Sequence, residues 1–339
     1  MRKLIYRWQK AIYRKKSWTR ILYPFSMLFG LFYTLRRALF HLKKPKPYPV
    51  PVVVVGNITL GGTGKTPLLK ALVSWAQARG LRPGIISRGY GRTSRGLVVA
   101  GPGIGPEQLG DEPFLLWRQT QVPVCVAERR ALAAQYLIDH AKVDIIFSDD
   151  GLQHHALYRD LELVVFDADR GVGNGRLLPA GPLREPLSRL KRVDVVLVRG
   201  GGVEDASLPV APLRLRYDIQ EAIHWRTCER RPLGAWVGQH VVAAAGIGYP
   251  DRFFTQLRRY GLLVTEVPLP DHAPLPEDIW NLHPDWPLFI TEKDAIKLTA
   301  VAPDVLTLLD RIWVVPLVVT LPVEFTAWFK HVLEQKRVL

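Results

Sequence analysis

The stretch Thr59-Leu60-Gly61-Gly62-Thr63-Gly64-Lys65-Thr66 follows the apolar run Val52-Val53-Val54-Val55 and precedes a helical pattern from about Pro67 to Ala78. It matches the phosphate-binding pattern G-x-x-x-x-G-K-[ST], except that Thr59 stands in place of the first glycine. A continuous apolar run is typical of a strand buried on both faces of a parallel sheet. The order of strand, glycine loop and helix therefore predicts a P-loop that binds a nucleotide.

The residue types in this loop suit the phosphates of ATP. Glycines allow consecutive backbone N–H groups to point at a phosphate, and the helix N-terminus adds positive potential. Lys65 can reach the β- and γ-phosphates, and the Thr66 hydroxyl can ligate Mg²⁺. We therefore expect ATP and Mg²⁺ as cofactors, and we expect the nucleotide to contact Thr59, Gly61, Gly62, Thr63, Gly64, Lys65 and Thr66.

Apolar runs alternate with helical patterns along the chain, which predicts a P-loop α/β fold with a doubly wound, mostly parallel sheet. Expected strands of this sheet also include 81–87, 122–127, 143–148, 161–166 and 193–198. Later strands near 241–245, 262–267, 288–291 and 312–319 predict a second, smaller α/β unit. We expect four segments in the 339 residues: an N-terminal arm (1–46), a P-loop domain (47–210), a linker hairpin (211–233) and a smaller C-terminal domain (234–339).

An acidic pair, Asp149-Asp150, ends the apolar strand at 143–148. Behind a P-loop, a carboxylate at a strand end is the group that reaches the nucleotide-bound Mg²⁺. An acidic pair alone is commonly only a turn or a helix cap. Together with Thr66, Asp149 and Asp150 are therefore the predicted metal residues.

Two further acids occur in Gly110-Asp111-Glu112-Pro113. An acid there could accept or orient the proton of a substrate hydroxyl, or Asp111 could cap a helix that has Pro113 in its first turn. Asp271-His272 has the same ambiguity, since an unaided histidine in a loop is most often only a loop residue. The residues alone leave these alternatives open.

Polar clusters stand where strands of the predicted sheet end. Ligands of doubly wound sheets bind at the carboxyl ends of the strands, so a phosphate- or sugar-binding role is the best interpretation of these clusters. A metal site at His154-His155 is disfavoured, because adjacent histidines point apart and no third ligand is spaced nearby. The predicted substrate-binding residues are Arg88, Glu112, Gln153, His154, Arg184 and Glu185.

The net charge of +15 is concentrated at the N-terminus. Residues 1–46 hold 13 Lys or Arg and no acid, and the rest of the chain is nearly neutral. This distribution excludes a basic face on the folded body, so no nucleic-acid partner is expected. Two distant cysteines argue against a disulfide framework or a zinc site.

The arm combines this charge with an uncharged, aromatic stretch of 15 residues, 21–35. As a helix it would be about 22 Å long, short of a hydrocarbon core of roughly 30 Å. Cations on both flanks suit a segment that lies in the interface of an anionic leaflet. Packing on the protein's own core and a single membrane span are the alternatives.

Several motifs occur in a fixed order along nearly the whole chain. Together with the arm they closely resemble the tetraacyldisaccharide 4'-kinase family of the lipid A pathway. The motifs are Gly56-Asn57-Ile58-Thr59-Leu60-Gly61-Gly62-Thr63-Gly64-Lys65-Thr66-Pro67, Ser87-Arg88-Gly89-Tyr90-Gly91, Gly110-Asp111-Glu112-Pro113, Asp149-Asp150-Gly151-Leu152-Gln153-His154, Pro179-Ala180-Gly181-Pro182-Leu183-Arg184-Glu185-Pro186, Gly246-Ile247-Gly248 and Thr291-Glu292-Lys293-Asp294-Ala295.

The resemblance implies a kinase that uses ATP and Mg²⁺ and is attached by its N-terminal helix, as a monotopic protein, to the cytoplasmic face of the bacterial inner membrane. Its substrate would be an acylated glucosamine disaccharide 1-phosphate, phosphorylated at the 4'-hydroxyl to give lipid IVA. Lys65 would act on the transferred phosphate, and Asp111 would act with His272 as a catalytic pair. No obligate protein partner is expected, and Thr59 agrees with the family pattern.

The main rival from another class is a membrane-targeted regulatory or partitioning ATPase. Those proteins have the pattern K-G-G-x-G-K-[ST], and their defining lysine would fall at position 60, which is leucine here. Their membrane helix also usually lies at the C-terminus. The sequence therefore favours the kinase.

Overall fold

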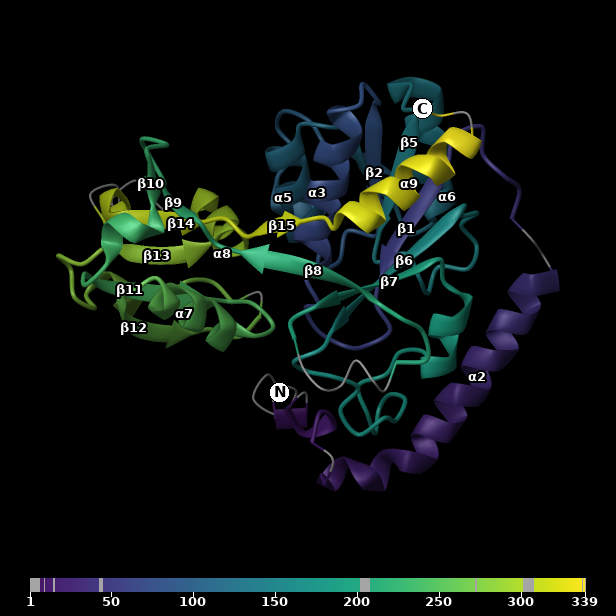
Figure 1. Ribbon diagram of the computed structural model, residues 1–339, viewed down its shortest axis with the longest axis horizontal. Helices are drawn as coiled ribbons and strands as arrows, with labels where there is room; N and C mark the ends of the chain where they lie inside the picture. Colours follow the sequence, from purple (N-terminus) through teal and green to yellow (C-terminus); the bar gives the residue numbers. More distant parts are fainter. Residues whose placement is uncertain are drawn as a thin grey trace. The chain divides into compact units, whose positions relative to one another are not determined.

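The computed structural model describes residues 7–8, 10–14, 16–42, 45–201, 208–271, 273–300, 308–336 and 338. Two compact units form the chain (Figure 1). The first comprises Met1–Arg216 and Thr320–Leu339, and the second comprises Tyr217–Val319. The predicted α/β class is confirmed in both units.

The first unit is built on a sheet with strand order β15-β8-β7-β6-β1-β5-β2-β4-β3 among the described residues. The pairings from β8 through β4 are parallel, and β3 runs antiparallel to its neighbour β4. Its strands are β1 (Val52–Gly56), β2 (Pro83–Ser87), β3 (Val98–Val99), β4 (Val124–Val126), β5 (Ile145–Asp149), β6 (Leu161–Asp167), β7 (Val195–Arg199), β8 (Leu213–Asp218) and β15 (Val318–Thr320).

The central strand β1 is fully buried, as its run of four valines predicts. It pairs in parallel with β5 on one side and β6 on the other, and Val55 stands opposite Asp149. The carboxyl ends of these strands therefore meet at one edge of the sheet. The loop after β1 and the acids after β5 are brought together by this register.

Helices of the first unit pack on the sheet and on one another. Contacts join α3 to β1, β2 and β5, and α3 also packs on α5. The bounds are α2 (Tyr23–Leu42), α3 (Lys65–Gln77), α4 (Pro106–Leu109), α5 (Asp111–Thr120), α6 (Arg130–Tyr136) and α9 (Val323–Gln335).

The second unit has its own sheet, with strand order β10-β9-β14-β13-β11-β12 among the described residues. The strands from β14 to β12 are parallel, and β9 and β10 add an antiparallel hairpin at one side. Bounds are β9 (Glu221–His224), β10 (Arg230–Pro232), β11 (His240–Ala245), β12 (Leu263–Pro268), β13 (Leu288–Thr291), β14 (Ile312–Val315), α7 (Pro250–Arg259) and α8 (Glu292–Ala295).

Two predicted boundaries differ from this division of the chain. Residues 211–233, expected as a linker hairpin, instead supply β8 to the first sheet and β9 and β10 to the second. The C-terminal helix α9, expected in the smaller domain, belongs to the first unit. The reason is packing: the buried ring of Phe329 lies against Trp75 of α3, with centroids 5.0 Å apart.

The arm helix α2 presents its small and polar face to the protein. Ser26 Oγ donates to the Leu177 carbonyl at 2.8 Å, and the Tyr33 hydroxyl donates to Glu185 at 2.8 Å. Further along the same face, the ring of Phe40 lies 5.9 Å from that of His155. The opposite face is apolar and exposed, and it consists of Phe25, Leu28, Phe32, Leu35 and Leu39.

This arrangement inverts the usual amphipathic helix, in which the apolar stripe faces the core. The prediction that the arm forms a helix is confirmed. Within the described part of the chain, no helix has the length and apolar character needed to cross a bilayer.

We expect Phe329→Ala to lower the free energy of unfolding by about 3–5 kcal/mol, because the substitution opens a cavity between α9 and α3. Urea titration followed by tryptophan fluorescence measures this change. The control is Val323→Ala at the exposed start of the same helix, for which we expect about 0.5 kcal/mol or less. Equal effects of the two substitutions would contradict the packing of α9 on the first unit.

Candidate active site

The loop between β1 and α3 has the backbone expected of a phosphate-binding loop. Gly61 has φ of 101° and Gly64 has φ of 92°, which is the left-handed region that side chains other than glycine rarely adopt. Lys65 begins α3 directly after Gly64, so the free N–H groups of the first helical turn face the loop. All seven residues predicted to contact nucleotide lie in this loop and the first turn of α3.

Asn57, the first residue of the loop, is fully buried and fixes its shape. Its side-chain Nδ2 donates to the carbonyl of Thr59 at 2.7 Å, and Lys65 Nζ donates to its Oδ1 at 3.2 Å. One side chain thus holds both the turn and Lys65. The motif placed Asn57 beside the loop, but sequence reasoning gave it no role.

The two acids after β5 have opposite environments. Asp150 adopts φ of 47°, and its carboxylate forms ion pairs with Lys65 Nζ at 3.4 Å and with Arg184 Nη1 at 2.9 Å. Although burial alone would raise the pKa of Asp150, Lys65 and Arg184 hold it well below its usual range. This carboxylate stays ionised and its charge is matched within the protein.

Asp149 is buried and accepts a hydrogen bond from Ser87 Oγ at 3.2 Å. Burial, together with the charge of Glu112, raises the pKa of Asp149 well above its usual range. Its Oδ1 is buried and has no hydrogen-bond partner among the described residues. A cation placed at this oxygen would stabilise the ionised form and supply the missing partner.

Gln153 and Glu185, both predicted to bind substrate, contact each other. Gln153 Nε2 donates to Glu185 Oε1 at 2.7 Å and to the backbone carbonyl of Asn57 at 3.1 Å. Glu185 is fully buried and also accepts from Tyr33 of α2 and pairs with Arg189 at 3.2 Å. Arg184 and Glu185 therefore connect Asp150 to the arm helix.

The segment with Asp111 and Glu112 lies beside the one with Arg88. A Cβ added to Gly110 would meet the carbonyl oxygen of Tyr90 at 2.9 Å, so the two segments are in close contact. Asp111 and Glu112 begin α5 and are half-buried, and the charge of Glu112 acts on Asp149. These acids therefore stand at the same edge of the sheet as the P-loop.

His154 is half-buried, and its pKa is lowered to about 4 by burial and by Arg130, Arg159, Arg36 and Arg88. A histidine in this field stays neutral at physiological pH. The charge of Arg88 therefore acts near His154, as expected for two residues of one site. His272, predicted as the partner of Asp111, lies outside the described residues, so the pairing stays a prediction.

The chain matches the family profile described as "Tetraacyldisaccharide-1-P 4'-kinase" over residues 18–334. It is similar to the tetraacyldisaccharide 4'-kinase of Methylobacillus flagellatus, with 45% identity over 87% of this chain and 88% of the relative. The protein of the same name from Chromobacterium violaceum is 43% identical over 96% of this chain and 97% of the relative. The chain belongs to the tetraacyldisaccharide-1-P 4'-kinase family.

A solved structure of a member of this family, the "apo" form of LpxK from Aquifex aeolicus in complex with ATP, has a similar fold. The TM-score is 0.75 with 27% sequence identity, over 94% of this chain and 99% of that chain. Enzyme class, P-loop fold and membership of a lipid A kinase family, all predicted from the motifs, are confirmed.

P-loop kinases in general bind Mg²⁺ together with ATP, and the residues present here fit such an ion. No group of three or more His, Cys, Asp or Glu side chains among the described residues could hold a metal alone. Mg²⁺ does not need one, because it is usually bound by one or two carboxylates together with substrate phosphates and water. The unpartnered Oδ1 of Asp149 is the oxygen best suited to it, with Thr66 on the loop side.

Sequence reasoning did not identify two arginines that lie close to the acids after β5 and to the P-loop. Arg130 is buried and donates to Ser148 Oγ at 3.3 Å, and its charge acts on Asp149 and Asp150. The guanidinium of Arg170 lies on the ring of Tyr13, 4.1 Å from its centroid, and against Gly61 of the P-loop. Neither residue is part of a local motif: Arg130 begins a helix and Arg170 lies in the turn after β6, and an arginine at either place gives no signal by itself.

We expect Lys65→Ala to reduce turnover at least about 10²-fold, because it removes a fixed positive charge from the developing charge on the transferred phosphoryl group. The measurement is ADP release by purified, folded enzyme. Lys70→Ala, further along α3, is the matched control and should keep nearly all activity. Near wild-type turnover by Lys65→Ala would show that the nucleotide site lies elsewhere.

Proposed function

We propose that this kinase transfers the γ-phosphoryl group of ATP to the 4'-hydroxyl of an acylated glucosamine disaccharide 1-phosphate, giving lipid IVA. The names of its relatives support the substrate class. The observation that carries the chemistry is the P-loop lysine, Lys65, paired with Asp150 beside a buried Asp149 that has an unsatisfied oxygen. Bound Mg²⁺, held by Asp149 and Thr66, would neutralise charge on the phosphates.

Each group then has a separate task. Lys65 stabilises charge on the phosphoryl group, while Asp150 and Arg184 hold the lysine and the loop in place. As the bond from the 4'-oxygen to phosphorus forms, the bond from phosphorus to ADP breaks. The hydroxyl proton passes to Asp111, which stands at the N-terminus of α5, with His272 as its partner. Arg88, Glu112, Gln153 and His154 surround the acceptor sugar, whereas Glu185, which is fully buried, supports the site by accepting a hydrogen bond from Gln153.

The decisive assay measures phosphate transfer from ATP to the tetraacyldisaccharide 1-phosphate in the presence of Mg²⁺. A kinase gives a bisphosphorylated lipid in proportion to ADP. A partitioning ATPase would instead release inorganic phosphate and respond to a protein or DNA partner. ATP hydrolysis without a phosphorylated lipid product would refute the proposed function.

For the proton step, we expect Asp111→Ala to lower kcat about 10²–10⁴-fold with little change in the KM for ATP. His272→Ala should cost less, and the double variant should cost less than the product of the single effects, because the two residues act as a unit. Asp149→Asn should instead change the dependence on Mg²⁺ concentration. Steady-state kinetics across pH and Mg²⁺ separates these effects, with Glu107→Ala on neighbouring α4 as the control.

Two outcomes would contradict this assignment. A defect of Asp111→Ala that is overcome by raising Mg²⁺ would make Asp111 a metal residue. Fully multiplicative effects of Asp111→Ala and His272→Ala would show that the two residues do not form a pair.

We also propose that α2 attaches the enzyme to an anionic membrane surface, which would place it at the cytoplasmic face of the bacterial inner membrane. Support comes from the exposed apolar face, in which Phe25, Phe32 and Leu39 are 59%, 68% and 64% exposed. The basic residues on both flanks of the stretch add attraction to anionic lipids. Because the other face of α2 packs on the protein, the helix would lie in the interface plane as a monotopic anchor.

We expect Phe32→Glu to weaken binding to anionic vesicles at least about tenfold, since a buried aromatic side chain contributes roughly 1.5–3 kcal/mol. The control is Thr34→Glu, which adds the same charge to α2 at an exposed site that is not apolar. Vesicle sedimentation at constant ionic strength gives both affinities. Equal loss by the two variants would mean that charge alone, and no apolar insertion, holds the enzyme on the membrane.

A further inference from the structure

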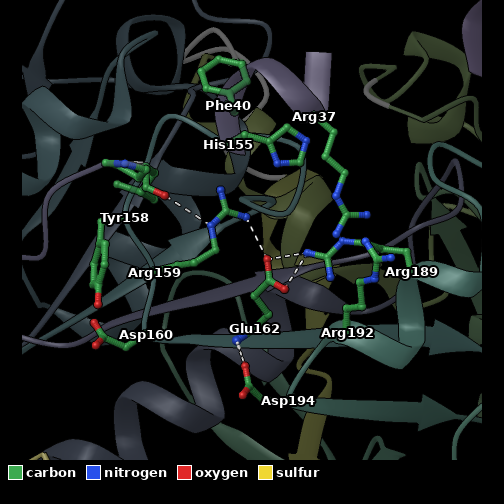
Figure 2. A pocket seen from close by; sticks show the side chains of 12 residues that line it. Arg37, Phe40, His155, Tyr158, Arg159, Asp160, Glu162, Arg189, Arg192 and Asp194 are labelled. Carbon is green, nitrogen blue, oxygen red and sulfur yellow. Dashed lines mark hydrogen bonds and ion pairs between the residues drawn. The ribbon is translucent and has the colours of Figure 1, made fainter. Parts of the chain in front are cut away.

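A cavity of about 520 Å³ lies in the first unit, beneath the C-terminal part of α2 (Figure 2). Its wall combines an aromatic ring from α2 with a concentration of guanidinium groups. No residue of the P-loop and neither acid of the metal side lines it. The lining residues are Arg37, Phe40, Pro45, His155, Leu157, Tyr158, Arg159, Asp160, Glu162, Arg189, Arg192 and Asp194.

The acids of the cavity are already engaged. Glu162 accepts from Arg159 Nη1 at 3.0 Å and from Arg189 Nη2 at 2.5 Å, so one carboxylate serves two cations. Asp160 accepts from the Val52 backbone at 2.9 Å and from Lys336 at 2.8 Å. Asp194 accepts from the backbone N–H of Glu162 at 2.7 Å. The charges of Glu162 and Asp160 are thus matched by other cations, while Asp194 forms no ion pair among the described residues, so two of the four lining arginines have no carboxylate partner.

Arg37 and Arg192 are those remaining cations. Within the described residues neither forms an ion pair; Arg37 only donates to the Tyr33 hydroxyl at 3.4 Å. Both line the same cavity as Arg159 and Arg189, and Figure 2 shows all four arginines among its lining residues. Like charges gathered around one cavity repel each other, so the arrangement favours a bound anion.

The pKa of His155 responds to the positive charge of the arginines around the cavity. Burial and the charges of Arg159, Arg36, Arg189 and Arg37 lower its pKa to about 4. Its ring also faces Tyr33 and Phe40 of α2. The histidine therefore stays neutral at physiological pH, and the cationic character of the cavity comes from its arginines.

The position of the cavity beside α2 indicates which kind of molecule bears the anionic group. Phe40 and Arg37 belong to the face of α2 that packs on the protein, and the other face of the same helix is the exposed apolar one. A ligand at this place can thus hold an anionic group against arginines and an apolar group beside the helix. Arginine forks match the oxygens of a phosphate group.

We propose that this cavity binds a phosphate group carried on a lipid, with Arg37 and Arg192 as its cationic ligands. Two lipids have this chemistry. One is an anionic phospholipid of the membrane, and the other is the substrate, through the phosphate that it already bears. The second source rests on the proposed function, whereas the first does not.

The first measurement uses the wild-type protein and does not depend on catalysis. An NMR titration of the His155 ring gives its pKa with and without glycerol phosphate. A phosphate bound beside the arginines offsets their charge, so the pKa of His155 should rise. Arg37→Gln/Arg192→Gln should abolish this rise, whereas Arg118→Gln/Lys330→Gln, which removes two exposed charges elsewhere in the unit, should keep it. A pKa that glycerol phosphate leaves unchanged would overturn the proposal.

The second measurement identifies the source. If the ligand is a phospholipid, Arg37→Gln/Arg192→Gln should bind vesicles containing phosphatidylglycerol at least about tenfold more weakly, with unchanged binding to vesicles of phosphatidylcholine alone. If it is the substrate, the variant should raise KM about tenfold or more for the disaccharide 1-phosphate, and not for the disaccharide without its phosphate. An unchanged variant in both assays would refute the site.

Loss of folding cannot mimic these results. Thermal unfolding and ATP affinity are measured for every variant, and the single variant Arg192→Gln alters only an exposed side chain. A wild-type enzyme inactive toward the disaccharide would refute the proposed function and still leave the glycerol phosphate and vesicle measurements valid.

Discussion

The buried carboxylate of Glu185 is the constraint on which the active-site edge of the first unit depends. A fully buried negative charge is costly unless it is hydrogen-bonded and paired, and here Gln153 and Tyr33 donate hydrogen bonds and Arg189 forms an ion pair. These three partners come from the loop after β5, from the arm helix and from the segment before β7. One charge therefore fixes three segments that are distant in sequence, and breaking such a buried set typically costs about 3–5 kcal/mol.

The neighbouring acids show how the same residue type is given two roles. Asp150 is neutralised by Lys65 and Arg184, so it organises the loop before any nucleotide is bound. Asp149, one residue earlier, is deprived of such partners and keeps an unsatisfied oxygen. The backbone changes between them as well, because Asp149 is the last residue of β5 and Asp150 adopts a positive φ of 47°.

Local patterns predict the parts of this protein that depend on local physics. The valines of β1, the glycines of the loop and the acids at the end of β5 could be read directly, because each follows from strand burial, backbone freedom or sheet topology. Contacts between distant segments could not. Asn57 holds Lys65 from eight residues away, and Gln153 meets Glu185 across 32 residues. The helical pattern of α9 likewise does not tell which unit it covers, and the pairing of Asp111 with His272 stays a prediction.

The inverted amphipathic character of α2 has a practical consequence for anyone handling the protein. The helix is commonly the kind of segment that is trimmed to obtain material free of detergent. Here Tyr33, on the face of α2 that packs on the protein, donates a hydrogen bond to Glu185. The hydroxyl of Ser26 donates to the Leu177 carbonyl and accepts from the Ala180 backbone N–H. A chain without α2 would leave the buried carboxylate of Glu185 without the hydrogen bond from Tyr33. The exposed apolar face and the contacts that stabilise the enzyme thus belong to the same helix, so removing the apolar face also removes those contacts.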